Sequence, residues 1–241
     1  IHFPIVQQSL VQMVGFMANV LYATSGIERE VSAMVQYGIK AKKICASCTD
    51  FTPWAECYQD FCGADTYGHD ATVSGLLLLP VDASGDVLSG LLKGSTWNHG
   101  SVANTAFAPS ERWGTTDDSV LFQILLSSNG YVGISPDYLG YGDSYEYFKS
   151  FLVKKAYQTS FVPLWLKAQQ IIATETSCQS ELANDVVVTG YSEGGFAAVA
   201  ISDAMHCMGV NVIKMLVGGA PYQIASEQFL SMHDDIKNQK Y

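Results

Sequence analysis

A serine flanked by two glycines is the feature of this sequence that most clearly indicates catalytic chemistry. The stretch VVVTGYSEGG, residues 186–195, holds the spacing Gly190-x-Ser192-x-Gly194. Residues that favour β-strands precede the serine and small or apolar residues follow it, which predicts a strand, a sharp turn and a helix. Such a turn lifts the serine hydroxyl above the carboxyl end of a sheet, where it can act as the nucleophile of acyl transfer.

The neighbours of the serine fit this chemistry. A Cβ at Gly190 or Gly194 would collide with nearby backbone in so tight a turn, which explains glycine at both positions. The N-terminal end of the next helix faces the hydroxyl, and the backbone N–H of Glu193 points to where an oxyanion would form. The alternative is a glycine-rich turn that only happens to hold a serine, and the flanking strand and helix favour the catalytic interpretation.

Strands and helices alternate along the chain, which predicts an α/β fold with a mostly parallel sheet. The predicted strands are residues 31–41, 72–80, 90–97, 131–135, 185–189 and 212–217. Helices are predicted within 115–130 and over 154–176 and 195–208. The turn residues Ser84-Gly85-Asp86 predict an antiparallel hairpin of the second and third strands. Residues 5–24 are apolar without a clean period and leave helix and strand both open.

Composition excludes several classes of function. The 241 residues are 48% hydrophobic and 15% charged, enough to bury one large core. The chain has 13 basic against 23 acidic side chains and no basic cluster, so we expect no nucleic-acid partner. No run approaches the roughly 20 apolar residues of a membrane span. The chain begins with Ile1 and shows no leader, so we expect any targeting segment to have been removed or never included.

Cysteines indicate the compartment. Six of them, an even number, stand at positions 45, 48, 57, 62, 178 and 207, which fits disulfides in a secreted protein or another oxidising compartment. Cys45-x2-Cys48 is also a plausible half of a zinc site, but the spacing to Cys57 and Cys62 is unlike the usual paired knuckles. We therefore predict disulfides and no metal, with a cysteine-rich insertion at 45–70.

One disulfide follows from the expected layout. Cys178 ends the helix before the strand of the serine motif, and Cys207 ends the helix after it. Strand and helix each cover about 20 Å, at ~3.3 and ~1.5 Å per residue, so both cysteines should lie at the amino ends of the strands. We predict a Cys178–Cys207 bond, which leaves the cysteines at 45–62 for two local bridges.

Four blocks carry a resemblance to a known family. They are STWNHGSVANTAFAPS, NGYVGISPDYLGYGDS, VVVTGYSEGGFAAVA and VGGAPYQI, within residues 72–225. In that order they resemble the secretory lipases, a family of α/β-hydrolases with fungal and bacterial members. The resemblance implies a doubly wound, mostly parallel sheet and a serine lipase or esterase that forms an acyl-enzyme on Ser192 without a cofactor. It also implies that Gly100 or Ser101, in the loop NHGS, supplies the second oxyanion N–H.

The remaining members of a catalytic triad are harder to find. The order in this fold is serine, acid, histidine, so we interpret His99 as a loop-shaping residue and Asp137 as an anchor of its own loop. His206 follows about four helical turns after Ser192, roughly 20 Å away at ~1.5 Å per residue, and cannot be the base. His233 fits an exposed helical histidine in the start of a cap at about 222–241.

The predicted strands account for six of the family's usual eight. The segment VIKMLVGG would then form an apolar, parallel edge, which soluble proteins avoid leaving open. We therefore expect residues 1–241 to be the N-terminal portion of one hydrolase domain. The C-terminal strands, the acid and the histidine would belong to a second chain after proteolytic processing or to a part absent from this sequence.

Substrate class is indicated only broadly. Tyr138, Tyr141 and Trp97 are aromatic residues near the expected carboxyl ends of the strands, where they could line an apolar acyl or alcohol site or belong to the core. An ester or lipid substrate is expected. The alternatives are a non-catalytic hydrolase-fold protein that binds a ligand, because the acid and base are not found, and a serine peptidase of the same fold.

Overall fold

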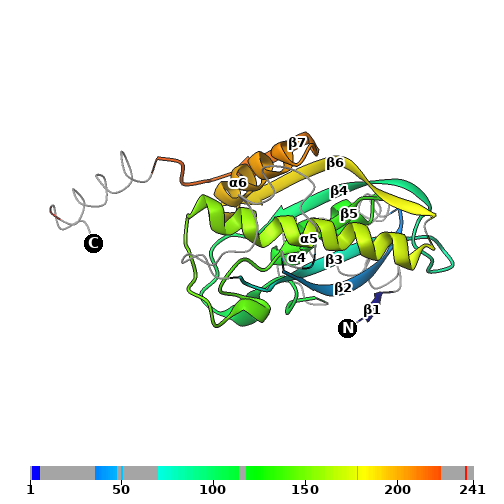
Figure 1. Cartoon of the computed structure of the whole chain (residues 1–241), viewed down its shortest axis with the longest axis horizontal. Helices are drawn as coiled ribbons and strands as arrows, with labels where there is room; N and C mark the ends of the chain where they lie inside the picture. The colour runs from blue at the N-terminus through cyan, green and yellow to red at the C-terminus, as the bar shows by residue number, and fades with distance from the viewer. Residues whose placement is uncertain are drawn as a thin grey trace, which may run out of the picture.

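A twisted sheet runs through the molecule, in a computed structural model that describes residues 2–5, 36–47, 50, 70–113, 118–177, 179–223 and 237. Its seven strands are β1 (His2–Ile5), β2 (Gly38–Ala46), β3 (Val73–Val81), β4 (Gly90–Asn98), β5 (Val132–Pro136), β6 (Ser180–Tyr191) and β7 (Asn211–Gly218). Their spatial order is β1-β2-β3-β5-β4-β6-β7, with β7 at one margin of the sheet (Figure 1).

The type of strand pairing changes once across the sheet, from antiparallel to parallel. The pairs β1–β2, β2–β3 and β3–β5 are antiparallel, whereas β5–β4, β4–β6 and β6–β7 are parallel. A parallel pair needs a crossover between its strands, and helices supply it here. The mostly parallel half of the sheet is therefore the half that contains the serine motif.

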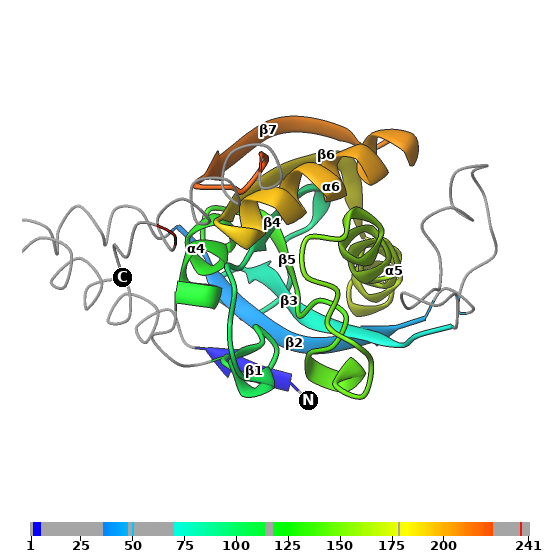
Figure 2. The same cartoon turned by 90° about the vertical axis from the view of Figure 1, so that its left-hand side faces the viewer.

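Three helices of the described part of the chain cover the two faces of this sheet. They are α4 (Asp118–Ser127), α5 (Lys154–Glu175) and α6 (Glu193–Cys207). Helix α4 lies on one side, and α5 lies on the other side, where it contacts α6 (Figure 2). Short 3₁₀ turns follow β4 at Thr105–Phe107 and β5 at Gly142–Ser144. Because both faces are covered, all residues of β3 and β5 are buried, as expected for a two-sided core.

Most predicted elements are found within a few residues of their expected bounds. The first predicted strand is displaced, because β2 begins at Gly38 and continues to Ala46, and residues 31–35 lie outside the described part. The alternation is in phase, since Ile39 and Ala41 are buried while Lys40 and Lys42 are partly exposed. The undecided segment 5–24 falls almost wholly outside the described residues.

The predicted hairpin of the second and third strands is wrong. The turn forms, because Asp82 accepts hydrogen bonds from the backbone N–H groups of Ser84 and Asp86. However, β3 and β4 are not neighbours in the described sheet, because β5 lies between them, and the turn is closed by an isolated antiparallel bridge between Val81 and Val87, before β4 begins. The two strands do run in opposite directions. Their separation arises because the buried strand β5 pairs with both.

The cysteine predictions are corrected in part. Cys45 is a free thiol in β2 that donates to Asp143 Oδ2 over 2.7 Å, so the four cysteines at 45–62 do not form two local bridges. Burial and this bond raise the pKa of the thiol to about 12. Cys207 is disulfide-bonded. Cys178 and the rest of the cysteine-rich segment lie outside the described residues, so the Cys178–Cys207 pairing stays a prediction.

Candidate active site

A single residue, Ser192, separates the last residue of β6 from the first residue of α6. Its backbone angles are φ 56° and ψ −124°, in the positive-φ region that side chains other than glycine rarely occupy. The Ser192 N–H donates to Gly218 O of β7 over 2.9 Å, which ties the turn to the neighbouring strand. A backbone conformation of this kind is characteristic of functional sites, where the surroundings hold the strain.

The flanking glycines are required by close backbone contacts. A Cβ on Gly190 would lie 2.6 Å from the carbonyl carbon of Gly194. A Cβ on Gly194 would lie 2.5 Å from the carbonyl carbon of Asn98, the last residue of β4. Glycine is also favoured at position 195, because a Cβ there would lie 2.7 Å from the Ala220 Cβ. The glycine pattern therefore allows the strand, the helix and the loop after β4 to converge on Ser192.

The loop after β4 reaches the serine because of strand register. Asn98 pairs with Gly190 across the β4–β6 ladder, and its side-chain amide donates to Thr189 O over 2.9 Å. Two residues later, a Cβ on Gly100 would lie 3.6 Å from the Ser192 Cβ. Ser101 follows as an exposed residue. The structure thus brings Gly100 beside Ser192, with Ser101 next along the loop.

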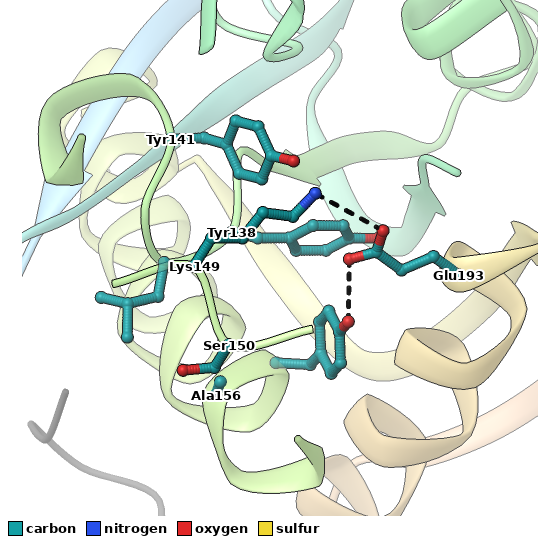
Figure 3. Close-up of a pocket in the computed structure, with 8 residues that line it drawn as sticks. Tyr138, Tyr141, Lys149, Ser150, Ala156 and Glu193 are labelled. Atoms are coloured by element: carbon teal, nitrogen blue, oxygen red, sulfur yellow. Dashed lines mark hydrogen bonds and ion pairs between the residues drawn. The ribbon is translucent and has the colours of Figure 1, made fainter. Parts of the chain in front are cut away.

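Glu193 opens α6, and its backbone N–H is one of the first helical donors, which have no partner within the helix. Its side chain is 2% exposed and points into a small pocket (Figure 3). The Tyr157 hydroxyl donates to Glu193 Oε1 over 2.8 Å, and Lys149 Nζ lies 3.8 Å from Oε2. Burial and the nearby Glu193 carboxylate raise the pKa of Tyr157 far above its ordinary value.

The structure brings together two of the three aromatic residues predicted for a substrate pocket. Tyr138 and Tyr141 are almost fully buried, and both line the pocket with Glu193. Trp97 is elsewhere, because it stacks on Phe122 of α4 at 4.5 Å between ring centroids, on the other side of the sheet from α5 (Figure 2). A role in substrate binding stays a prediction for all three.

His99 is a buried residue of the loop after β4. Its Nδ1 lies 2.8 Å from Gly100 O, its Nε2 lies 3.4 Å from Asp137 O, and its ring stacks on Tyr138 at 4.2 Å. Burial lowers the pKa of the imidazole, so the neutral form is favoured. These contacts, made largely with backbone carbonyls, match the loop-shaping role that the sequence predicted.

Asp137 anchors the loop after β5, as expected from its position before the serine. Its carboxylate accepts hydrogen bonds from the hydroxyls of Ser74 and Ser110, both 2.6 Å, and from the Ser110 N–H at 2.8 Å. Burial raises the pKa of Asp137, and the serine donors oppose that shift. Ser74 lies on β3, so the carboxylate joins three separate parts of the chain.

The base of a triad is not identified among the described residues. His206 occupies the last turn of α6, at the end of the helix opposite Ser192, as the sequence indicated. His233 and the predicted cap lie outside the described residues, apart from residues 222, 223 and 237. No group of three His, Cys, Asp or Glu side chains suited to a metal occurs in the described part. None of the helices described there is long and apolar enough to span a bilayer.

Sequence patterns did not reveal Asn98, Lys149 or Tyr157. Asn98 could have been noticed as a polar residue at the end of an apolar strand. Lys149 was visible as a lone basic residue in an aromatic loop, but a single charge has no periodicity that predicts its partner. Tyr157 is one of three aromatic residues in α5, and only the helix packing turns it to Glu193.

Comparison with solved structures identifies the fold. A crystal structure from Legionella pneumophila, described as a candidate hydrolase, matches with a TM-score of 0.61 and 18% identity, over 92% of this chain and 52% of that one. A ligand-bound form of LipA, the rice cell wall degrading esterase from Xanthomonas oryzae, matches with a TM-score of 0.59 and 18% identity, over 93% of this chain and 50% of that one. No family model and no curated protein matches the sequence.

A second LipA structure gives a TM-score of 0.57 at 20% identity, over 88% of this chain and 48% of that one. Together with the strand order and the turn at Ser192, these matches establish the α/β-hydrolase fold. At such identities they establish the fold alone. The chain spans about half the length of the solved structures it matches.

Proposed function

We propose that this chain carries the nucleophile and the oxyanion hole of a serine carboxylic ester hydrolase of the secretory lipase type. The observation that carries the proposal is the strained Ser192, held between β6 and α6 beside the loop of Gly100. An exposed serine on an ordinary turn would not need positive φ together with two glycines that exclude any Cβ.

In the proposed reaction the Ser192 hydroxyl oxygen attacks the ester carbonyl carbon and its proton passes to a base. The negative charge that develops on the carbonyl oxygen is stabilised by the N–H of Glu193 and by an N–H of Gly100 or Ser101. Collapse of this intermediate breaks the bond to the alcohol, which leaves with the proton from the base. Water then hydrolyses the acyl-enzyme by the same steps.

We further propose that the acid and the histidine come from a C-terminal part of the protein, in the same chain or in a second chain after processing. Two observations support this. Strand β7 pairs only with β6 in the described sheet, and Met215, Leu216 and Val217 on it are exposed. The solved structures that match are also about twice as long as this chain.

An ester or lipid substrate and a secreted location complete the proposal. The likeness to an esterase that degrades rice cell walls supports an ester substrate. The disulfide at Cys207 supports an oxidising compartment, because disulfides are rare in reducing ones.

Labelling with a fluorophosphonate tests the proposal directly. We expect the complete protein to be labelled at Ser192 and to hydrolyse p-nitrophenyl esters faster than peptide anilides. Ser192→Ala should abolish labelling and reduce ester hydrolysis by at least about 10⁴-fold. Ser202→Ala is the matched control, since that hydroxyl lies in α6 and donates to Ala198 O. A protein that is folded but never labelled would instead be a ligand-binding member of the fold, and preference for anilides would indicate a peptidase.

A further inference from the structure

The Glu193 side chain is buried although it has no role in the proposed reaction. It is a carboxylate with 2% exposure, and burying a charge is costly unless partners compensate it. Tyr157 satisfies Oε1, but Oε2 has no hydrogen-bond partner among the described residues, and its nearest cation is Lys149. Glu193, whose N–H is a candidate oxyanion donor, is therefore paired through its side chain with Lys149.

Lys149 also contacts the other side of the oxyanion hole. Its Nζ donates to the carbonyl oxygen of Val102 over 3.3 Å, and Val102 directly follows Gly100 and Ser101. The ammonium group lies 4.6 Å from the centroid of the Tyr141 ring, and the Tyr141 hydroxyl donates to the same Val102 carbonyl over 2.7 Å. Figure 3 shows Lys149 reaching toward Glu193 beside Tyr141.

These contacts join three segments that are far apart in the sequence. Lys149 lies in the loop after β5, Glu193 begins α6, and Val102 lies in the loop after β4. The two candidate oxyanion donors belong to the last two of these segments, and no covalent connection shorter than about 90 residues fixes their relative position. The Lys149 ammonium group contacts both of these segments.

We propose that Lys149 is a positioning residue that fixes the two halves of the oxyanion hole relative to each other. It pairs with the Glu193 carboxylate on one side and holds the Val102 carbonyl on the other. The inference rests on the proposed acyl transfer through Ser192. The charge contributes chiefly in the transition state, because the donors must meet an oxygen whose negative charge is largest there.

Steady-state kinetics of Lys149→Met in the complete protein test this role. Losing a whole oxyanion donor costs 10²–10³-fold in kcat in known enzymes, so a displaced donor should cost about tenfold or more, with KM changed less than about twofold. Lys149→Arg, which keeps the charge and the donors, should restore most of kcat. The rate constant of fluorophosphonate labelling should fall in parallel, because charge develops on the phosphoryl oxygen in the same hole.

Lys154→Met is the matched control. Lys154 is five residues further along, is exposed and pairs with the exposed Asp203, so its loss should leave kcat unchanged. If Lys149→Met does not fold, Lys149→Gln replaces it, since an amide can still donate to Val102 while the charge toward Glu193 is lost. For either folded variant, kcat within twofold of the parent or a change in KM alone overturns the proposal. An inactive parent protein, or activity that survives Ser192→Ala, refutes the proposed function instead.

Discussion

The carboxyl end of strand β6 and the sheet edge beside it differ sharply in packing. At its carboxyl end the chain is packed so closely that Gly190 and Gly194 cannot carry a Cβ, and Ser192 is held with positive φ. Along its outer flank lies β7, whose apolar side chains are exposed and which has no further strand beside it in the described sheet. The difference teaches that the turn at Ser192 is packed by described residues alone, whereas β7 is exposed among them, and we propose that another part of the protein covers it.

Adding one methyl group at the elbow should have the largest effect. We expect Gly194→Ala to reduce esterase activity by at least about 100-fold and to destabilise the fold by about 1–3 kcal/mol, because the Cβ would collide with the Asn98 carbonyl. Hydrolysis of a p-nitrophenyl ester and urea unfolding measure the two effects. Gly85→Ala is the control: a Cβ there would have no atom within 4 Å, and only its positive φ is unfavourable, so the substitution should cost about 1 kcal/mol and no activity. Full activity in Gly194→Ala would contradict the packing described here.

A charge on β7 tests whether the open margin is covered in the complete protein. Leu216 is 61% exposed in the described structure, and Leu91 on β4 is 71% exposed. If another part of the protein covers β7, Leu216→Asp should lower the free energy of unfolding by about 2 kcal/mol or more, since it would bury an unpaired charge. Leu91→Asp should cost less than about 0.5 kcal/mol. Equal, small costs for the two variants would show that nothing covers this strand.

An ion-pair cluster in the antiparallel half of the sheet provides the prediction with the smallest expected effect. Glu175 of α5 accepts bonds from Lys40 at 2.7 Å and Lys42 at 2.9 Å on β2, and these lysines lower its pKa from 4.5 to about 2. A carboxylate with a lowered pKa stabilises the fold above its unfolded value, so this contribution is present above about pH 4.5 and is lost as the pH falls toward 2.

Glu175→Gln should therefore lower the free energy of unfolding by about 1 kcal/mol at pH 7, and the difference from the parent should shrink at pH 3. Urea unfolding at the two pH values measures it. Glu181→Gln, at an exposed position of β6, is the comparison and should change little at either pH. A Glu175→Gln effect that is the same at pH 3 and pH 7 would argue against the ion pairs.

Much of the elbow could be predicted because its signal is local. The residues around Ser192 dictate a strand, a strained turn and a helix within about 20 positions, and the glycines mark where backbone segments approach closely. The same was true of the helix starts and of the α/β alternation. Strand neighbours could not be predicted in this way. The turn at Asp82–Asp86 formed as its residues demanded, yet β5 separated the two strands that it connects.

The sequence by itself determined that a serine would stand at the end of a parallel strand beside a helix N-terminus, because glycine, strand and helix preferences act over short distances. The tertiary structure alone decided that Trp97 faces α4 and that Cys45 is a free thiol hydrogen-bonded to Asp143. It also decided that Lys149 contacts both Glu193 and the Val102 carbonyl. Each of these contacts pairs residues brought together by strand order and helix packing. Such pairings depend on the burial of the whole core, and no pattern of neighbouring residues encodes them.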